Sequence, residues 1–461
     1  MQHQFTGTLT ASDMKKHIQH TFDMPAQAAQ ISILLTATEG AVDGLSTMLT
    51  LTIFDSQGFR GAGHRGGQKH AVTIGPEKTT PGYRKGSLPM GTWIVQIDTH
   101  RILADRPCDY QLDIDITLGS PLDSFDEPTQ KTPDFSPIAN PSPGWYRGDL
   151  HSHTIHSDAS WDVPDLVAAA HAYHLDFIAL TDHNTISGLA EMASFSGPEL
   201  LTMGGQELTT FWGHAVCLGQ HDWLDWRVTQ TGPEIAAIAE QLETQGYPFI
   251  IAHPKDIGDP KCTGCRWLYP EMMPGSARFV EIWNESWYGH NPTSRAKNED
   301  GLALWYQWLN DGHRLVATAG SDTHGPQGYA QNPGFNIVYA NTLSEADILA
   351  ALWQGHLYLS AGPTLTFTAQ TTDGVQPMMG DTLLMTDEKQ TATFTVTWEA
   401  CPDEAVLSFI VDGKPKEAIP IIEQGSQSWS LSSAQGSWCL VEIRDYENAM
   451  LAITNPIFFG I

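Results

Sequence analysis

The sequence predicts an α/β domain between two β-sandwiches. Three observations lead to this prediction. Alternating apolar and polar segments, separated by Gly, Asp and Pro turns, fill residues 1–120. Strand-like and helix-like patterns then take turns over residues 145–361, and short alternating segments return over residues 362–461. A chain of 461 residues also exceeds what one hydrophobic core usually serves, so several domains are expected.

The first domain is expected to be an antiparallel β-sandwich, because no long helical pattern separates its strands. Its clearest predicted strands are Ile31–Thr38, Thr47–Phe54, Thr92–Asp98 and Tyr110–Ile116. Residues 121–144 then carry six prolines together with Asp, Ser and Thr. This composition favours an extended linker over a packed element, so a domain boundary is placed there.

The middle domain is expected to contain a parallel sheet, open or closed into a barrel. Its apolar runs lack strict alternation, as strands buried on both faces do. The predicted strands include Asp176–Thr181, Pro248–Ala252, Phe279–Trp283 and Leu315–Ala319. The predicted helices are Val163–Tyr173, Pro233–Glu243 and Asp300–Leu309, of which the first two have a proline in the first turn.

The last domain is expected to be a second β-sandwich, with a hairpin turn at Asp412-Gly413. Its predicted strands are Thr364–Thr368, Ala392–Trp398, Val406–Val411 and Trp438–Ile443. Nothing in these strands suggests chemistry.

Charge and cysteine content limit the classes of partner. The 53 acidic and 24 basic residues give a net charge of −29, which opposes binding to a nucleic-acid polymer. The N-terminus lacks the features of a signal peptide and no long apolar stretch occurs, so a cytoplasmic protein without a membrane segment is expected.

Cys262 and Cys265 have the spacing of a zinc or redox pair, but no second such pair follows. A loop with two thiols or a local disulfide is therefore expected there.

A metal-binding pattern begins after the linker. Three histidines and two aspartates lie within ten residues, from Asp149 to Asp158. His151 and His153 alternate, so on an extended chain both imidazoles leave the same face, as two ligands of one ion must. Such a pair alone is a weak signal.

Further metal-capable side chains lie where the other predicted strands begin or end. They are His183, Glu207, His214, His253, Asp322 and His324. In parallel α/β folds the carboxyl ends of the strands meet at one site, so these residues are expected to converge. Histidines with a few carboxylates and no thiolate favour zinc, iron or manganese.

These segments resemble the polymerase and histidinol phosphatase (PHP) superfamily, and more closely its CehA/McbA-like branch of metallohydrolases. The matching stretches are Gly148–Thr154, Ser157–Asp158, Ile178–Asn184, Gly205–Glu207, Gly213–His214, Ala252–Pro254, Val280–Asn284, Gly320–His324 and, at the closing strand, Thr454–Phe459. The resemblance implies a distorted (β/α)7 barrel that holds two or three divalent metal ions at its carboxyl-end mouth.

The resemblance also assigns ligands. His151, His153, Glu207 and Asp322 would hold one ion, Glu207 would bridge to a second ion held by His214 and His253, and Asp158, His183 and His324 would hold a third. Many relatives have histidine where Asp158 stands, and His156 lies close enough in sequence to compete for that role.

The expected activity is hydrolysis of a small phosphate monoester or diester by a hydroxide that bridges two of the ions. Glu207, Asp158 and His324 would act through the metal centre, and Asp182 would orient a ligand or act as an acid. Lys255 and Arg295, with Lys297, are candidates for contacting the anionic substrate. The alternatives are a carbamate, amide or ester hydrolase with the same centre, and a binding protein that keeps metal without turnover. The oligomeric state and the role of the sandwiches stay open.

Overall fold

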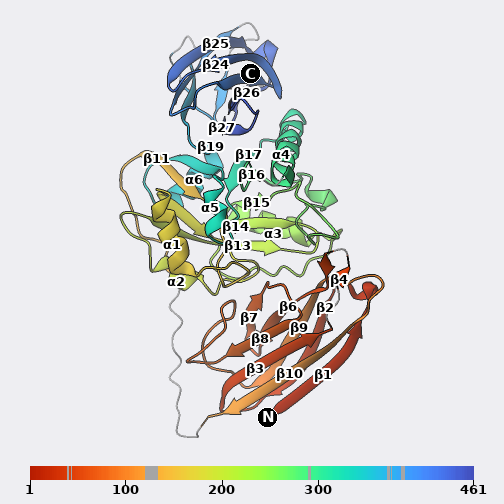
Figure 1. The fold of residues 1–461 in the computed structure, drawn as a ribbon. Coiled ribbons are helices and arrows are strands. Elements are labelled where there is room, and N and C mark those ends of the chain that lie inside the picture. Colours follow the sequence, from red (N-terminus) through yellow and green to blue (C-terminus); the bar gives the residue numbers. More distant parts are fainter. Residues whose placement is uncertain are drawn as a thin grey trace.

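The computed structural model describes residues 1–461 except 39–40, 43, 120–132, 289–291, 371–373, 375, 386–389 and 461. Three groups of elements follow one another along the molecule, with the middle group between the N-terminal and C-terminal strands (Figure 1). The first half of the predicted linker, residues 121–132, lies outside the described residues. Residues 133–143 pack on the middle part, where Phe135 is buried and Ala139 N–H donates to the Leu343 carbonyl at 2.8 Å.

The N-terminal part consists of two four-stranded antiparallel sheets, ordered β1-β10-β3-β8 and β2-β9-β6-β7. Alternation places Ile31, Ile33 and Leu35 of one sheet and Val95 and Ile97 of the other in one core. The elements are β1 (Gln2–Leu9), β2 (His17–Met24), β3 (Ala28–Ala37), β4 (Ala41–Val42), β5 (Leu45–Ser46), β6 (Met48–Asp55), β7 (Gly58–Gly63), β8 (Lys69–Ile74), β9 (Gly91–Arg101), β10 (Cys108–Leu118) and a short 3₁₀ turn (Ala11–Asp13). These multiple β-sheets fit the predicted sandwich.

The middle part is a curved mixed sheet with helices around it. Its strands are β11 (Gly144–Asp149), β12 (Phe177–Leu180), β13 (Leu201–Thr209), β14 (His214–Leu218), β15 (Phe249–Ile251), β16 (Phe279–Asn284), β17 (Val316–Gly320), β18 (Phe335–Ala340) and β19 (Leu357–Ser360). Its helices are α1 (Val163–Ala172), α2 (Leu189–Ala193), α3 (Glu234–Thr244), α4 (Pro292–Asn310), α5 (Pro326–Ala330), α6 (Glu345–Gln354) and a 3₁₀ turn (Pro270–Met272).

The strand pairing is mixed, whereas the sequence patterns predicted a parallel sheet. Strands β11, β12 and β13 pair in parallel, as do β15, β16 and β17. Strand β14 is antiparallel to both of its neighbours, and β18 is antiparallel to β11 and β19. The physical reason at β14 is the short connection from Thr209 to His214, which can form a hairpin but not a crossover.

Two buried asparagines bridge the gap between β17 and the far end of the curved sheet. Asn336 on β18 binds both the N–H and the carbonyl of Ala319, at 2.9 and 2.7 Å. Asn455, just after β27, does the same for Ala317 at 2.8 and 3.0 Å. Side-chain amides thus satisfy backbone groups where no strand ladder runs.

The C-terminal part continues the middle sheet. Strand β27 pairs with β19, and β26, β23 and β24 follow, while β20, β22 and β25 form a second sheet. The elements are β20 (Thr364–Gln370), β21 (Thr382–Leu384), β22 (Thr391–Glu399), β23 (Ala405–Val411), β24 (Lys414–Ile421), β25 (Gly425–Ser432), β26 (Trp438–Arg444), β27 (Met450–Thr454), β28 (Ile457–Gly460) and a 3₁₀ turn (Ser433–Gln435). Within the described ranges, none of the helices is both long and apolar enough to cross a membrane.

Candidate metal centre

The metal-capable side chains gather where strands of the middle sheet begin or end. His151 and His153 follow β11, His183 follows β12, and Asp322 follows β17. His253 and Asp322 have φ angles of +28° and +48°, a region that residues other than glycine rarely adopt. Backbone strain of this kind persists where the surrounding structure demands a particular side-chain position.

Glu207 lies at the centre of the cluster and is fully buried. Its carboxylate is 2.7 Å from His183 Nδ1, 3.1 Å from His214 Nδ1, 3.3 Å from His253 Nε2, 3.4 Å from His151 Nε2 and 3.5 Å from His153 Nε2. Burial opposes the charged form, but the neighbouring imidazoles hold the pKa of this carboxyl well below its usual value. One carboxylate therefore lies within 3.5 Å of five imidazoles.

Two aspartates complete the arrangement. Asp322 Oδ1 lies 2.9 Å from His153 Nε2 and 3.4 Å from His151 Nε2. Asp158 Oδ1 lies 3.2 Å from His324 Nε2 and 3.6 Å from His183 Nε2. Asp158 and His324 are the more open end of the cluster, with 29% and 39% of their side chains exposed.

The nine predicted ligands form four overlapping groups, and within each group the donor atoms lie within 4.8 Å of one another. The groups are His153, Asp158, His183 and His324; His151, His153 and Glu207; His151, His253 and Asp322; and His183, Glu207 and His214. In the part of the chain that the structure describes, every such group is built from these nine side chains. Glu207 and His183 each belong to two groups, as is expected of ligands shared between adjacent metal sites.

The buried donor atoms fit cations. His151 Nε2, His153 Nδ1, Glu207 Oε2 and His214 Nε2 are all buried without a hydrogen-bond partner. A buried polar atom without a partner is costly, so such atoms are expected to have another use. Imidazole and carboxylate donors at this density suit a first-row divalent metal.

Glu281 supports two of the predicted ligands and was missed as a site residue by the sequence reasoning. Its Oε1 lies 3.0 Å from His151 Nδ1, and its Oε2 accepts from the His253 N–H and from Asn284 Nδ2, both at 3.0 Å. Binding Nδ1 of His151 leaves Nε2 facing the cluster, the arrangement that a metal-binding histidine needs. A buried-strand pattern of apolar residues interrupted by a glutamate was the available signal.

Asp182 and His156 lie beside the cluster but take no part in the four groups. Asp182 accepts hydrogen bonds from Thr154 N–H, Thr154 Oγ1 and Ser157 Oγ, at 2.8, 2.7 and 2.6 Å. It therefore fixes the turn that leads to Asp158. His156 Nδ1 lies 2.7 Å from Ser187 Oγ, so the geometry favours Asp158 over His156 at the third site.

Two of the cations predicted to contact the substrate anion, Arg295 and Lys297, have partners outside the metal cluster. Arg295 donates to the backbone carbonyls of Glu447 and Asn448, which belong to the C-terminal part. Lys297 is 2.9 Å from Asp256 and 3.0 Å from Glu285, so two carboxylates already neutralise it. Lys255 follows His253 by two residues and bridges through its backbone to Arg266. Neither Arg295 nor Lys297 is free to bind a substrate anion.

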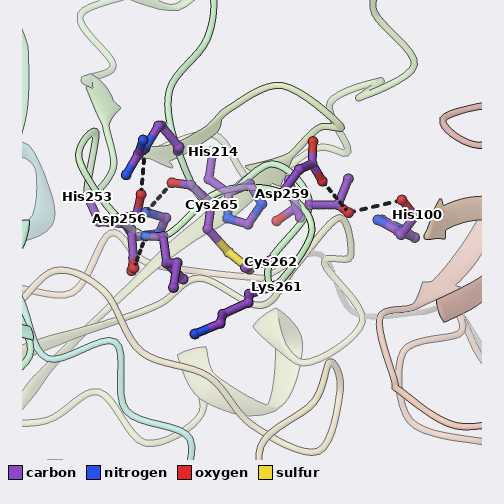
Figure 2. Close-up of a disulfide and its surroundings, with 12 residues drawn as sticks. His100, His214, His253, Asp256, Asp259, Lys261, Cys262 and Cys265 are labelled. Carbon is purple, nitrogen blue, oxygen red and sulfur yellow. Dashed lines mark hydrogen bonds between the residues drawn. A yellow bond between two sulfur atoms is a disulfide. The ribbon is translucent and has the colours of Figure 1, made fainter. Parts of the chain in front are cut away.

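A disulfide lies next to the cluster. Cys262 and Cys265 are bonded, and Figure 2 shows this disulfide beside His214, with His253 and His100 on either side. The Cys265 carbonyl accepts from His253 Nδ1 at 2.9 Å, which turns His253 Nε2 toward Glu207. The local disulfide left open by the sequence is thus present, and its loop orients a predicted ligand.

A cavity of about 370 Å³ opens at Asp322 and His324. It is further lined by Ser160, Glu285, Ser321, Gly325, Pro326, Gln327, Gly328 and Gln331. Its volume is that of a site for a small molecule. Among the described residues no lysine or arginine lines it.

No family model and no curated protein matches this chain. A two-domain protein from Bacteroides vulgatus, containing a predicted PHP-like metal-dependent phosphoesterase, is similar over 70% of this chain and 98% of its own, with 16% identity and a TM-score of 0.37. A protein from Bifidobacterium adolescentis, provisionally named a metal-dependent phosphoesterase, covers 46% of this chain and 96% of its own, with 16% identity and a TM-score of 0.30. An amidohydrolase from Chromobacterium violaceum covers 39% and 88%, with 17% identity and a TM-score of 0.26. At these scores the similarity says nothing further about the activity of this chain.

Proposed function

We propose that this protein is a metal-dependent hydrolase of the PHP type that cleaves a small phosphate monoester or diester. The observation that carries the proposal is the convergence of nine histidine, aspartate and glutamate side chains, four of which have a buried donor atom without a partner. Core packing alone gives no reason to bury so many ionisable groups together.

Two or three zinc, manganese or iron ions would be held by the residues of the four groups. When bound there, the ions would lower the pKa of coordinated water and offset the charge that grows on the oxygens of the substrate. Glu207 would be shared between two ions, and Glu281 would keep His151 Nε2 turned toward them. Asp158 and His324, at the open end, would be the ligands closest to the entering substrate.

A phosphate ester is favoured over a carbamate or carboxylic ester because it is charged before the reaction begins. A cluster of divalent ions attracts such an anion strongly, whereas a neutral ester gains less. The net charge of −29 gives poor long-range steering, so recognition must occur at contact range, within the roughly 8 Å screening length of physiological salt. The cavity at His324 supports a small substrate over a polymer.

The test compares phosphate esters with an acetate and a carbamate, all with aryloxide leaving groups, on the metal-loaded protein. Manganese- or zinc-loaded enzyme should hydrolyse p-nitrophenyl phosphate or its bis-ester faster than p-nitrophenyl acetate or 1-naphthyl methylcarbamate, relative to each uncatalysed rate. Inorganic phosphate should inhibit competitively. Turnover of the acetate or carbamate with inert phosphate esters would favour the acyl-hydrolase alternative, and metal binding without turnover of any ester would favour a binding protein.

A further inference from the structure

The N-terminal sandwich is attached to the segments that carry the predicted metal ligands. The Gly82 N–H donates to Ser187 Oγ at 3.0 Å, and the Gly82 carbonyl accepts from Thr185 Oγ1 at 2.7 Å. Both serine and threonine follow closely after His183. Arg65 donates to the Ile155 carbonyl, three residues before Asp158. The sandwich therefore holds the chain at two ligands of the third site.

The same sandwich also contacts the disulfide loop. Thr263 Oγ1 donates to the His100 carbonyl at 3.0 Å, and Lys15 pairs with Asp259 at 2.7 Å. Arg101 donates to the carbonyls of Pro260 and Lys261 at 2.9 and 2.8 Å. Figure 2 shows His100 facing this loop. Contacts on both sides of the cluster fix the sandwich over the ligand-bearing ends of the strands.

His64, immediately after β7, extends from the sandwich to the metal cluster. Its ring centroid lies 4.5 Å from that of His183, which is the same spacing as between the predicted ligands His153 and His324. Its Nδ1 is buried without a hydrogen-bond partner. His100 packs behind it at 5.0 Å, edge to face, and is itself held at Nε2 by Thr50 Oγ1 at 3.1 Å.

His64 lies beside the ligand set without belonging to it. It joins none of the four groups in which the donor atoms lie within 4.8 Å of one another. Its unpaired nitrogen is therefore available to a partner other than a metal ion. The position beside His183 is where a molecule bound on the third-site ion would meet the sandwich.

Two of the three cations expected to recognise an anion, Arg295 and Lys297, are already committed elsewhere. Arg295 binds carbonyls of the C-terminal part, and Lys297 is paired with two carboxylates. An imidazole N–H next to the metal centre can replace them, because it donates one directed hydrogen bond to an anionic oxygen.

We propose that His64 is a substrate-contacting residue, supplied by the N-terminal sandwich, that donates a hydrogen bond to a phosphoryl oxygen of the substrate on the metal ions. The proposal rests on the proposed function, since it requires a tetrahedral oxyanion at the centre. It gives the sandwich a role, because His64 would contact the substrate from the sandwich.

The experiment measures binding of inorganic phosphate to the manganese-loaded full-length protein by calorimetry, with metal content determined on the same samples. His64→Ala should weaken phosphate binding about ten- to hundredfold, the range for one hydrogen bond to a charged group. His64→Gln, which keeps a donor, should recover part of the loss. His20→Ala is the matched control, because His20 lies in the same sandwich and its Nε2 is 3.1 Å from the Tyr110 hydroxyl, away from the cluster.

Metal content should equal that of the wild type in all three variants. Wild-type phosphate affinity in His64→Ala would overturn the inference alone, and so would the loss of a metal ion, which would make His64 a ligand instead. Failure of the metal-loaded wild type to bind phosphate would overturn the proposed phosphoesterase activity, and the inference with it. Because His64→Gln preserves size and polarity, its affinity remains decisive if the alanine variant does not fold.

Discussion

Replacing Glu207 by Gln keeps the shape of the side chain and removes the charge that five imidazoles share. The five nitrogens lie 2.7 to 3.5 Å from its two oxygens, and the carboxylate is fully buried. Removing one partner from a buried ionic network costs about 3–5 kcal/mol. The free energy of unfolding of the metal-free variant should therefore fall by about 3–5 kcal/mol. Because even an outer-shell partner is worth roughly 10–100-fold in metal affinity, loss of a shared ligand should exceed about 100-fold at both ions.

The assay is elemental analysis after dialysis against a fixed free-metal concentration, combined with denaturant unfolding of the metal-free proteins. Glu345→Gln is the matched control, since Glu345 is a buried glutamate of the same part that binds the Gly204 N–H at 2.9 Å and His221 at 3.1 Å. Glu207→Gln should lose two ions per chain, while Glu345→Gln keeps them. Wild-type metal content in Glu207→Gln would refute the idea that this carboxylate bridges two ions.

Three further predictions concern other residues of the cluster and its surroundings. Glu281→Gln should weaken metal affinity roughly 10–100-fold in chelator competition, because Glu281 orients His151, and an unchanged affinity would contradict that role. Asp158→Asn should lose one ion per chain and His156→Asn none; the reverse result would reassign the ligand. In the metal-free protein, burial opposes protonation, but Asp158 and Asp322 raise the pKa of His324 to about 10, and Glu207 raises that of His253 to about 9. The bound protons stabilise the folded state fully below the ordinary histidine pKa of 6.5, and this stabilisation is lost as the pH rises through 9–10. Calorimetry should therefore show the melting temperature of the metal-free protein falling between pH 6.5 and 10, relative to that of the metal-loaded protein. A constant difference would contradict it.

Each strand range predicted from the local sequence overlaps a strand of the structure, because apolar runs and alternation report directly which residues of a strand are buried. The helix Val163–Ala172 was recognisable from its proline at the start, whereas α6 was missed although Ser344 caps its start and Gly355, in the left-handed conformation, ends it. The antiparallel direction of β14 relative to β13 and β15 was not predicted, because apolar runs carry no information on strand direction.

Most of the metal-capable residues were singled out at the ends of predicted strands, because the carboxyl ends of parallel strands meet at one site, and the ligand role of Asp158 came from the resemblance. Contacts between distant parts could not be predicted in this way. His64 follows β7 and His183 follows β12, and Arg295 faces the C-terminal strands instead of the site. No local pattern encodes how two domains pack, so the contribution of the N-terminal sandwich became visible only in the structure.

The most direct test of the metal centre is anomalous X-ray diffraction from crystals of the purified protein, collected at the zinc, iron and manganese edges. Two or three anomalous peaks are expected within about 2.0–2.3 Å of donor atoms of the nine residues, with Glu207 touching two of the peaks. The absence of any peak among these residues after metal loading, or a single peak elsewhere, would contradict a multinuclear metal centre at the ends of these strands.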